Sequence, residues 1–297
     1  MRNDRGAKMS FDDAHDATVA PELLQVAQAF RAGMNQIPVS NPPAPDLVLE
    51  RTEIGGVPAL RILAPGANPH QIICHFHGGG WVAGSPETHR GMLGELSRAA
   101  RATILAPDYS LAPEHPFPAA YDESIRIYES LRVSGHRFCL SGDSGGGGMV
   151  LGVLNHAALN GHIKARAGLL ISPWSDLRLE LPSITQLAKR DPVVTVGAMR
   201  TMIKAYAGGL DLTDPRVSPL LGLNNRLPPL LIQVGSNEIL LDDSLEIDRR
   251  ARSAGGDVEL EVWSKMSHVW HLSTGSQRDA HRALRRAGAF LQEHLRV

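Results

Sequence analysis

Short apolar runs alternate with helix-length segments along most of this 297-residue chain. The run Leu230-Leu231-Ile232-Gln233-Val234 is nearly all apolar, as expected of a strand buried on both faces of a parallel sheet. Neighbouring parallel strands need crossover connections, which are usually helices. The alternation therefore predicts an α/β fold with a mostly parallel sheet flanked by helices.

Eight runs are expected to form strands, at residues 47–53, 59–63, 71–76, 103–106, 138–140, 168–172, 230–234 and 258–263. The first two mix polar and apolar residues, which suits an antiparallel edge of the sheet. Helices are expected at residues 86–101, 118–132, 145–160 and 242–254, with a final helix within 277–295. Ser85 and Pro86 mark the start of the first helix, because a capping hydroxyl and a proline at the first helical position favour a helix N-terminus.

Two stretches depart from this alternation and are interpreted as insertions placed over the sheet. Residues 1–45 contain an amphipathic segment at 22–30 and a proline-rich tether. Residues 181–218 contain a D-P-V-V sequence and a helix-like segment near 198–207. The sheet and its helices are then expected from residues 46–180 and 219–297.

Composition excludes several classes of protein. Lys and Arg number 30 against 31 Asp and Glu, and no basic stripe is present, so neither nucleic acid nor an anionic membrane is expected as a partner. The polar amino terminus does not resemble a signal peptide, and no apolar run reaches the length of a membrane span. A cytoplasmic protein is predicted. Cys74 and Cys139 each lie in an expected strand and lack metal-ligand spacing, so they are expected to be small buried hydrophobic residues.

The sequence Gly142-Asp143-Ser144-Gly145-Gly146 matches the pattern G-x-S-x-G. It lies between an expected strand and an expected helix, where a sharp turn would lift the serine oxygen above the sheet. A flexible glycine loop or a phosphate cradle is the alternative. A phosphate cradle would need G-K-[ST] or G-x-G-x-x-G at this turn, and neither is present. We therefore predict that Ser144 is a nucleophile.

The sequence His77-Gly78-Gly79-Gly80-Trp81 follows the expected strand at 71–76. Acyl transfer builds negative charge on a carbonyl oxygen, and converging backbone N–H groups stabilise that charge. Gly78, Gly79 and Gly145 are the predicted donors of this oxyanion hole, although a plain glycine turn would also fit the loop taken alone. His77 is expected to brace the loop rather than to react, and His75 is expected to be structural.

The base and the acid are predicted from loop position, since this kind of fold places nucleophile, acid and histidine in that order. His268 follows the last expected strand and is the predicted base, with His271 as its competitor. Its pKa is expected near the ordinary value of about 6.5. Glu238, Asp242 and Asp243 follow the strand at 230–234; the two aspartates open a helix, where carboxylates commonly cap N–H groups. Glu238 is therefore the predicted acid.

Together these motifs resemble the hormone-sensitive-lipase-like esterases, which are bacterial family IV of the α/β-hydrolase superfamily. Residues 108–120 resemble the D-Y-R-L-A-P-E-x-P-F-P-A-A stretch of the family, and residues 172–177 resemble S-P-W-x-D-L. The similarity spans residue 47 to the end. Gly145 replaces the usual alanine, and Ser110 replaces the usual arginine. The acidic motif D-P-L-x-D falls on residues 238–242, so that Glu238 stands in the position of the acid.

The resemblance implies a carboxylesterase acting on short-chain acyl esters through an acyl-enzyme, with no metal and no organic cofactor. It also implies that residues 1–45 and 181–218 form a helical cap over the acyl pocket, and that a homodimer forms through the last strand, residues 257–263. Two other functions remain open. A small-ligand-binding protein on the same fold is one, although the presence of His268 argues against it; an amidase or peptidase with the same triad is the other.

Overall fold

The computed structural model describes residues 19–296. Residues 1–18 lie outside this range. The prediction that the amino terminus is not a signal peptide concerns these residues, and so does the beginning of the predicted cap segment 1–45. No helix among the described residues is long and apolar enough to cross a membrane.

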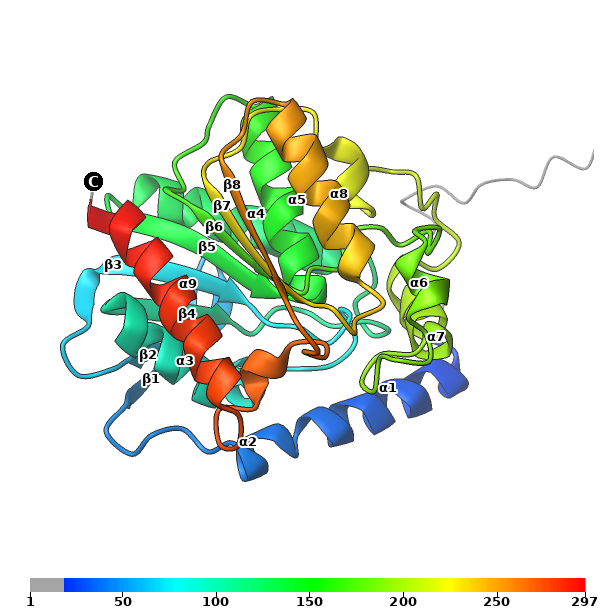
Figure 1. Ribbon diagram of the computed structural model, residues 1–297, viewed down its shortest axis with the longest axis horizontal. Coiled ribbons are helices and arrows are strands. Elements are labelled where there is room, and N and C mark those ends of the chain that lie inside the picture. The colour runs from blue at the N-terminus through cyan, green and yellow to red at the C-terminus, as the bar shows by residue number, and fades with distance from the viewer. Residues whose placement is uncertain (1–18, 297) are drawn as a thin grey trace, which may run out of the picture.

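An eight-stranded sheet forms the centre of the molecule (Figure 1). Its strands are β1 (Val48–Ile54), β2 (Val57–Leu63), β3 (Asn68–Phe76), β4 (Ala102–Pro107), β5 (Arg137–Asp143), β6 (Gly168–Ile171), β7 (Leu230–Gly235) and β8 (Val258–Trp263). They lie in the order β1-β2-β4-β3-β5-β6-β7-β8. β1 and β2 pair antiparallel with their neighbours, and the other strands pair in parallel. The predicted fold class is therefore confirmed, including the antiparallel edge.

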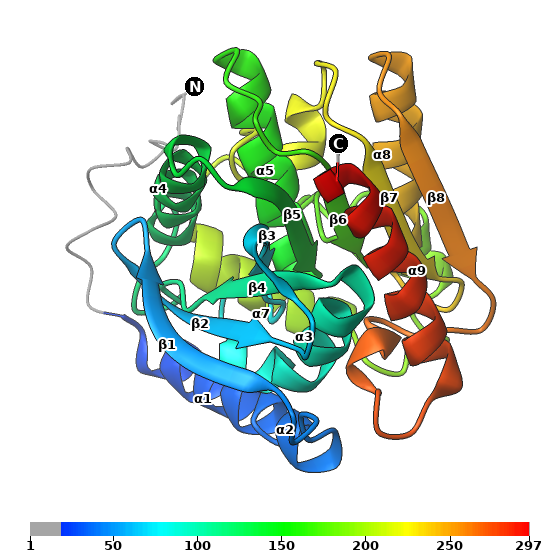
Figure 2. The ribbon, with the colours of Figure 1, turned by 90° about the vertical axis from the view of Figure 1, so that its left-hand side faces the viewer.

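Helices cover both faces of the sheet. They are α3 (Pro86–Ala100), α4 (Ala119–Val133), α5 (Gly145–Leu159), α8 (Leu241–Ser253) and α9 (Arg278–Arg296). α3 and α9 lie on one side, and α4, α5 and α8 lie on the other (Figures 1 and 2). α3 begins as predicted: the Ser85 hydroxyl accepts the Thr88 N–H, Thr88 reciprocates, and Pro86 occupies the first turn.

The core is divided by the two faces of the sheet, because successive side chains of a strand point to opposite sides. Ile72 and Cys74 of β3 pack with α4 and α5, whereas Ile73 between them packs with α3 and α9. The two cysteines follow this rule and lie on opposite faces, Cys74 on the first and Cys139 on the second. Both are buried free thiols, as predicted. Burial raises the pKa of Cys139 to about 12 and raises that of Cys74 further.

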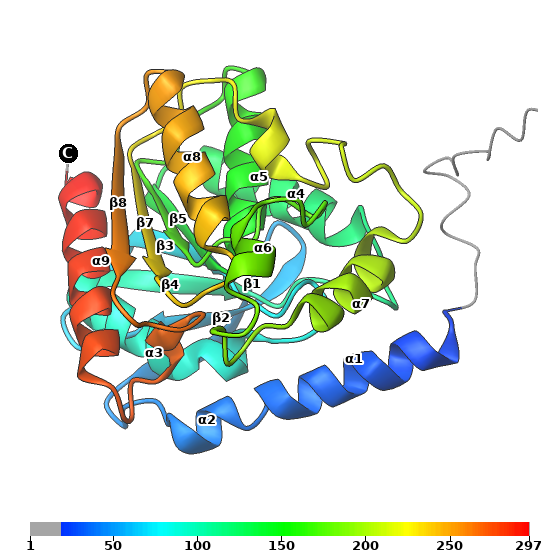
Figure 3. The same cartoon turned by 45° about the vertical axis from the view of Figure 1, so that its right-hand side comes forward.

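The segments that fall outside the alternation lie at the end of the sheet to which β7 and β8 point (Figure 3). They contain α1 (Pro21–Met34), α2 (Ile37–Ser40), α6 (Ser183–Gln186) and α7 (Val196–Ala207), with single 3-10 turns at Pro219–Gly222 and Trp270–Leu272 elsewhere in the chain. α1 runs beneath α7 in both views. Since carboxyl ends of parallel strands are where such folds bind ligands, these helices lie over the expected site.

Arg31 ties α1 to the rest of the molecule. Its guanidinium donates to the backbone oxygens of Val82 and Ala112, and it makes two 2.7 Å bonds to the Glu114 carboxylate. A bidentate arginine–carboxylate pair fixes orientation as well as distance. α1 is therefore held by one polar clamp in addition to its apolar contacts.

Candidate active site

Ser144 occupies the sharp turn between β5 and α5. Its backbone has φ 52° and ψ −123°, a left-handed conformation that a side chain rarely adopts. Close backbone crossings explain the neighbouring glycines: a Cβ on Gly146 would lie 2.0 Å from the Phe76 oxygen, and one on Gly142 would lie 2.3 Å from the Gly146 oxygen. Strain of this kind persists only where the surroundings enforce it, which is common at functional sites.

A chain of hydrogen bonds joins the three residues predicted as nucleophile, base and acid. His268 Nε2 lies 2.9 Å from Ser144 Oγ, and His268 Nδ1 lies 2.9 Å from Glu238 Oε2. Glu238 is completely buried, and Ser144 and His268 are each 9% exposed. Because the carboxylate can only accept, Nδ1 carries a proton, and Nε2 of the neutral ring is free to accept the serine proton.

Glu238 is held in place by two further donors. Its Oε1 accepts the Ser172 hydroxyl at 2.8 Å and the Gly235 N–H at 2.6 Å. The Ser172 hydroxyl oxygen also accepts the N–H of Val269, next to His268. Sequence reasoning missed Ser172, although it is the first residue of the S-P-W segment and directly follows β6, the strand beside β7. It links the acid loop to the histidine loop.

Two opposing influences set the pKa of His268. Burial lowers it, whereas the hydrogen bond and the charge of Glu238 raise it, and the net pKa lies above its ordinary value. The expectation of an unshifted pKa near about 6.5 is therefore wrong, because the balance between burial and the charge of Glu238 depends on tertiary packing, which the order of the loops does not give.

His271, the competing base, is turned away from Ser144. Its Nε2 lies 2.9 Å from Gln233 Oε1 in the core, and burial lowers its pKa to about 3. The structure therefore brings His268, and not His271, to the serine.

Asp242 and Asp243 do not cap α8, since no side-chain cap is present there. Asp242 accepts the Ser183 N–H, and Asp243 accepts the N–H groups of Ser175 and Asp176. The expectation of helix caps is wrong because both carboxylates bind N–H groups of the segment that follows β6 instead. Burial raises the pKa of Asp243 to about 7.

One of the three predicted oxyanion donors is wrong. The Gly78 N–H donates to Asp143 Oδ1 at 3.0 Å, so it cannot point to a substrate. Gly79 and Gly80 line the cavity beside Ser144, and within residues 19–296 their N–H groups have no protein acceptor. Gly145 begins α5 against Gly80, with 3.4 Å between its built Cβ and the Gly80 nitrogen. Gly79, Gly80 and Gly145 thus lie close to one another beside Ser144.

His77 is buried beneath the same loop. Its ring stacks on Tyr109 at 4.2 Å between centroids, and its Nδ1 lies 2.8 Å from the Gly78 oxygen. Burial lowers its pKa to about 3, so the ring is neutral near pH 7 and donates through Nδ1 to that carbonyl. These contacts match the predicted bracing role.

A cavity of about 340 Å³ opens over Ser144 and His268. Phe30 and Met34 of α1 and Met202 of α7 form part of its wall, with Trp174 near the serine. Apart from Asp143 and His268, the side chains that line it within the described range, 19–296, carry no ionisable group. The cavity therefore suits an uncharged, largely apolar ligand.

Ser110, which stands where the family usually has arginine, makes its own contacts with an acidic residue. The Ser110 hydroxyl and N–H both donate to the Glu123 carboxylate, at 2.8 and 2.7 Å. At this position the Glu123 carboxylate is therefore bound by a neutral hydroxyl and a backbone N–H.

Hydroxyl, imidazole and carboxylate joined in this order, beside a glycine loop with N–H groups unpaired in the described part of the chain, can carry out nucleophilic acyl transfer. Nothing in residues 19–296 groups three or more His, Cys, Asp or Glu side chains in a way that could hold a metal ion. The fold and site together define the class as an α/β hydrolase with a serine centre.

Comparisons with known proteins narrow this class. A family model described as alpha/beta hydrolase fold matches residues 73–272. The chain is 38% identical over 231 residues to an acetyl-hydrolase of Streptomyces hygroscopicus, covering 77% of each protein. It is 33% identical over 269 residues to an esterase of Acinetobacter venetianus, covering 89% of this chain and 88% of the relative.

Solved structures agree. A crystal structure of an esterase from the bacterial hormone-sensitive lipase family superimposes with a TM-score of 0.86 at 37% identity, covering 94% of this chain and 100% of the other. A hormone-sensitive lipase from a metagenome library gives a TM-score of 0.86 at 34% identity, covering 96% and 95%. The chain belongs to this family, the bacterial hormone-sensitive-lipase-type esterases of the α/β-hydrolase fold, as the sequence resemblance predicted.

Proposed function

We propose that the protein hydrolyses short-chain acyl esters through an acyl-enzyme formed on Ser144. The observation that carries this proposal is the unbroken chain of hydrogen bonds from Ser144 through His268 to Glu238. Family membership supports the same class of reaction.

In the first half of the reaction, Ser144 Oγ attacks the ester carbonyl while His268 Nε2 takes its proton. Glu238 stabilises the imidazolium that forms and keeps the ring in the correct tautomer. Negative charge on the carbonyl oxygen is met by the N–H groups of Gly79, Gly80 and Gly145. His268 then gives its proton to the departing alcohol. In the second half, water attacks the acyl-enzyme by the same route, and Ser144 regains its proton as the acid leaves.

The cavity supports a small, neutral substrate. Its volume of about 340 Å³ lies at the lower end of ordinary ligand pockets, and its wall is mostly apolar. α1 and α7 both contribute to that wall, so we propose that residues 1–45 and 181–218 act as a cap. Asp191 supports this arrangement: it accepts the N–H groups of Val193 and Val194, which line the cavity, and that of Ile239, next to Glu238.

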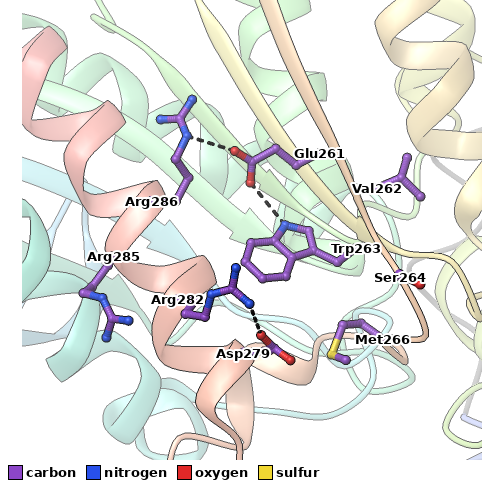
Figure 4. A pocket seen from close by; sticks show the side chains of 9 residues that line it. All are labelled: Glu261, Val262, Trp263, Ser264, Met266, Asp279, Arg282, Arg285 and Arg286. Atoms are coloured by element: carbon purple, nitrogen blue, oxygen red, sulfur yellow. Dashed lines mark hydrogen bonds and ion pairs between the residues drawn. The ribbon is translucent and has the colours of Figure 1, made fainter.

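A homodimer through β8 is part of the proposal. β8 is the last strand of the sheet and pairs only with β7 among the described strands. Val262 on it is 45% exposed, and the adjoining Glu261 bonds Arg286 and Trp263 (Figure 4). Such an edge can pair with a second copy about a two-fold axis. Sedimentation analysis of the native chain tests this pairing; a monomer at micromolar concentration would contradict it. The cytoplasmic location predicted from the sequence stays a prediction.

The decisive experiment compares wild-type protein with Ser144→Ala on p-nitrophenyl esters of increasing acyl length. Removing the nucleophile of such a triad lowers kcat by on the order of 10⁶-fold, so turnover should fall to background. Ser134→Ala, at an exposed serine far from the site, is the matched control and should retain full activity. Retention of more than a tenth of the activity in Ser144→Ala would refute the proposal.

The same preparation separates the two other functions. A fluorophosphonate probe should label wild type at Ser144 and leave Ser144→Ala unlabelled. A folded wild-type protein with neither label nor turnover would be a binding protein instead. Matched anilides of the preferred acyl group test amide cleavage, which we expect to be much slower than ester cleavage.

A further inference from the structure

Asp143 is a buried carboxylate that takes no part in the hydrogen bonds from Ser144 to Glu238. It ends β5 directly before Ser144 and is 1% exposed. Burying an ionised carboxylate costs several kcal/mol unless it is paired and hydrogen-bonded. Burial alone would raise its pKa, but the charge and hydrogen bonds of His89 and His75 hold the pKa well below its ordinary value. A carboxylate retained in this form requires a structural reason.

Three donors surround the Asp143 carboxylate. Oδ1 accepts the Gly78 N–H at 3.0 Å and faces His75 Nε2 at 3.0 Å, while Oδ2 faces His89 Nε2 at 3.3 Å. Since an ionised carboxylate only accepts, both imidazoles present an Nε2–H to it. The Gly78 N–H also lies 3.4 Å from His89 Nε2; that nitrogen carries a proton, so the carboxylate is its acceptor.

Each imidazole is fixed from its other side. His75 Nδ1 lies 2.9 Å from the Ser141 hydroxyl, and His89 Nδ1 lies 2.8 Å from the Thr88 hydroxyl. Both rings are completely buried. They come from β3 and α3, whereas Asp143 comes from β5, so three elements of the core converge on one carboxylate. Its position is therefore much better defined than that of a surface carboxylate.

The glycine loop sits directly on this carboxylate. A Cβ built on Gly78 would lie 2.2 Å from Asp143 Oδ2, and Gly79 and Gly80 follow without an intervening residue. The carbonyls of the loop have their own partners: the Gly78 oxygen faces His77 Nδ1, and the Gly79 oxygen accepts the N–H groups of Val82 and Ala83. Asp143 holds the Gly78 N–H itself. Donors of an oxyanion hole must be held within about 0.5 Å of the productive geometry. A displacement of Gly78 would therefore also move the N–H groups of Gly79 and Gly80.

We propose that Asp143, held by His75 and His89, is a positioning residue that aims the N–H groups of Gly79 and Gly80 at the substrate carbonyl. It acts through the Gly78 N–H and does not touch the reacting atoms. The inference rests on the proposed ester hydrolysis, because it concerns the charge that develops during acyl transfer.

A through-space effect of the same carboxylate has the opposite sign. A negative charge close to the oxyanion hole disfavours negative charge on the substrate oxygen, so removing it would accelerate acyl transfer. Positioning predicts that removal slows the reaction. The direction of the change thus separates positioning from this effect on the oxyanion. The charge of Asp143 also raises the pKa of His268, so enzymes with and without that charge are compared above that pKa, where the imidazole is neutral.

The test is Asp143→Asn, which keeps the size of the side chain and loses its charge. Two quantities are measured: kcat and KM on the preferred p-nitrophenyl ester, and the Ki of a trifluoromethyl ketone of the same acyl length. Ser144 adds to the ketone carbonyl, and the resulting hemiketal oxyanion occupies the oxyanion hole. Misaligned donors should lower kcat by about 10- to 100-fold, given that losing one donor costs about 10²–10³. Ki should rise in parallel while KM changes less than threefold.

Asp243→Asn is the matched control. Asp243 is equally buried and accepts the N–H groups of Ser175 and Asp176, but it lies away from the glycine loop. A general loss of folding on removing a buried carboxylate would appear in both variants as a lower melting temperature. Only Asp143→Asn should change Ki.

His89→Gln provides a second variant if Asp143→Asn does not fold, because it removes one support and leaves the carboxylate in place. We expect kcat to fall and Ki to rise about 3- to 10-fold together. An unchanged or improved kcat and Ki in the folded variant would overturn the proposal. Wild-type protein that neither turns over the ester nor binds the ketone would instead refute the proposed function, and the positioning role with it.

Discussion

The two walls of the cavity are built in different ways. The wall formed by the ends of the strands carries Ser144, His268 and Glu238, all at most 9% exposed and joined by bonds of 2.9 Å. The wall formed by α1 and α7 contributes only apolar side chains to the cavity, among them Phe30 and Met202. α1 is held by a clamp at Arg31 whose side chain is 27% exposed.

This difference suggests that one wall carries the catalytic groups and the other determines which substrates fit. Buried, charge-assisted hydrogen bonds hold reacting groups within narrow limits, as catalysis requires. Apolar contacts on helices are non-directional and tolerate changes in shape. Substitutions in the strand wall should therefore change kcat, and substitutions in the helix wall should change KM and the preference among acyl chains.

The largest effect is expected from Glu238→Gln in the strand wall. The amide keeps the shape but no longer enforces the productive tautomer of His268, and such a change costs about 10⁴-fold in kcat in a serine protease triad. Glu238→Asp is the control, since it keeps the charge and should recover part of the loss. Steady-state kinetics on one ester measures both. A Glu238→Gln enzyme within tenfold of wild type would mean that another group acts as the acid.

The next effect is the pH dependence of kcat/KM. Catalysis needs neutral His268, so activity should rise with pH and fall about tenfold per pH unit below the pKa of His268. Glu238 raises that pKa, so the midpoint of the rise should lie above the ordinary value of about 6.5. In Glu238→Gln the largest raising influence is lost while burial and the weaker effects of Asp191 and Asp143 remain, so the midpoint should move to lower pH. An equal midpoint in both enzymes would contradict this assignment.

In the helix wall, Met202→Ala should change chain-length preference. The Met202 sulfur lies close to Gly80: a Cβ on Gly80 would be only 2.4 Å from it. Removing the Met202 side chain therefore opens space next to the oxyanion hole. The ratio of kcat/KM for hexanoate over acetate should rise about tenfold, since a methylene in an apolar pocket is worth about 1–3 kcal/mol. Met199→Ala removes the same volume from α7 outside the cavity and should leave the ratio unchanged.

The smallest effect is expected from Arg31→Gln, which removes the clamp on α1. Partly exposed ion pairs contribute little to stability, so folding and kcat should be nearly unchanged. KM should rise about two- to fivefold as the helix wall loosens. Arg98→Gln, which breaks a similar exposed pair with Asp46, is the control and should leave KM as it is. A change in kcat larger than that in KM would show that the two walls are not independent.

The sheet was the most predictable part of the molecule. Buried strands need apolar runs, so all eight lie within a few residues of the predicted positions. The residues around Ser144 were predictable because a sharp strand-to-helix turn leaves a local pattern, and Glu238 because the order of loops follows the order of strands.

The errors concern side chains and N–H groups whose partners are distant in the sequence. Gly78 and Gly79 are neighbours in one glycine run. The Gly78 N–H is occupied only because Asp143, 65 residues further on, lies where it can accept that hydrogen bond. Asp243 was expected to cap its own helix, yet it binds Ser175, 68 residues earlier. Local pattern cannot distinguish such donors and acceptors, because their partners are chosen by tertiary packing.

The two buried thiols, Cys74 and Cys139, can report when the core around the sheet opens. With the pKa of Cys139 raised to about 12 and that of Cys74 higher still, almost no thiolate forms near neutral pH in the folded chain. A maleimide or disulfide reagent should react only with molecules whose sheet has opened, one cysteine reporting each face. Labelling rates would then follow local opening of the two sides of the sheet separately, without any engineered site.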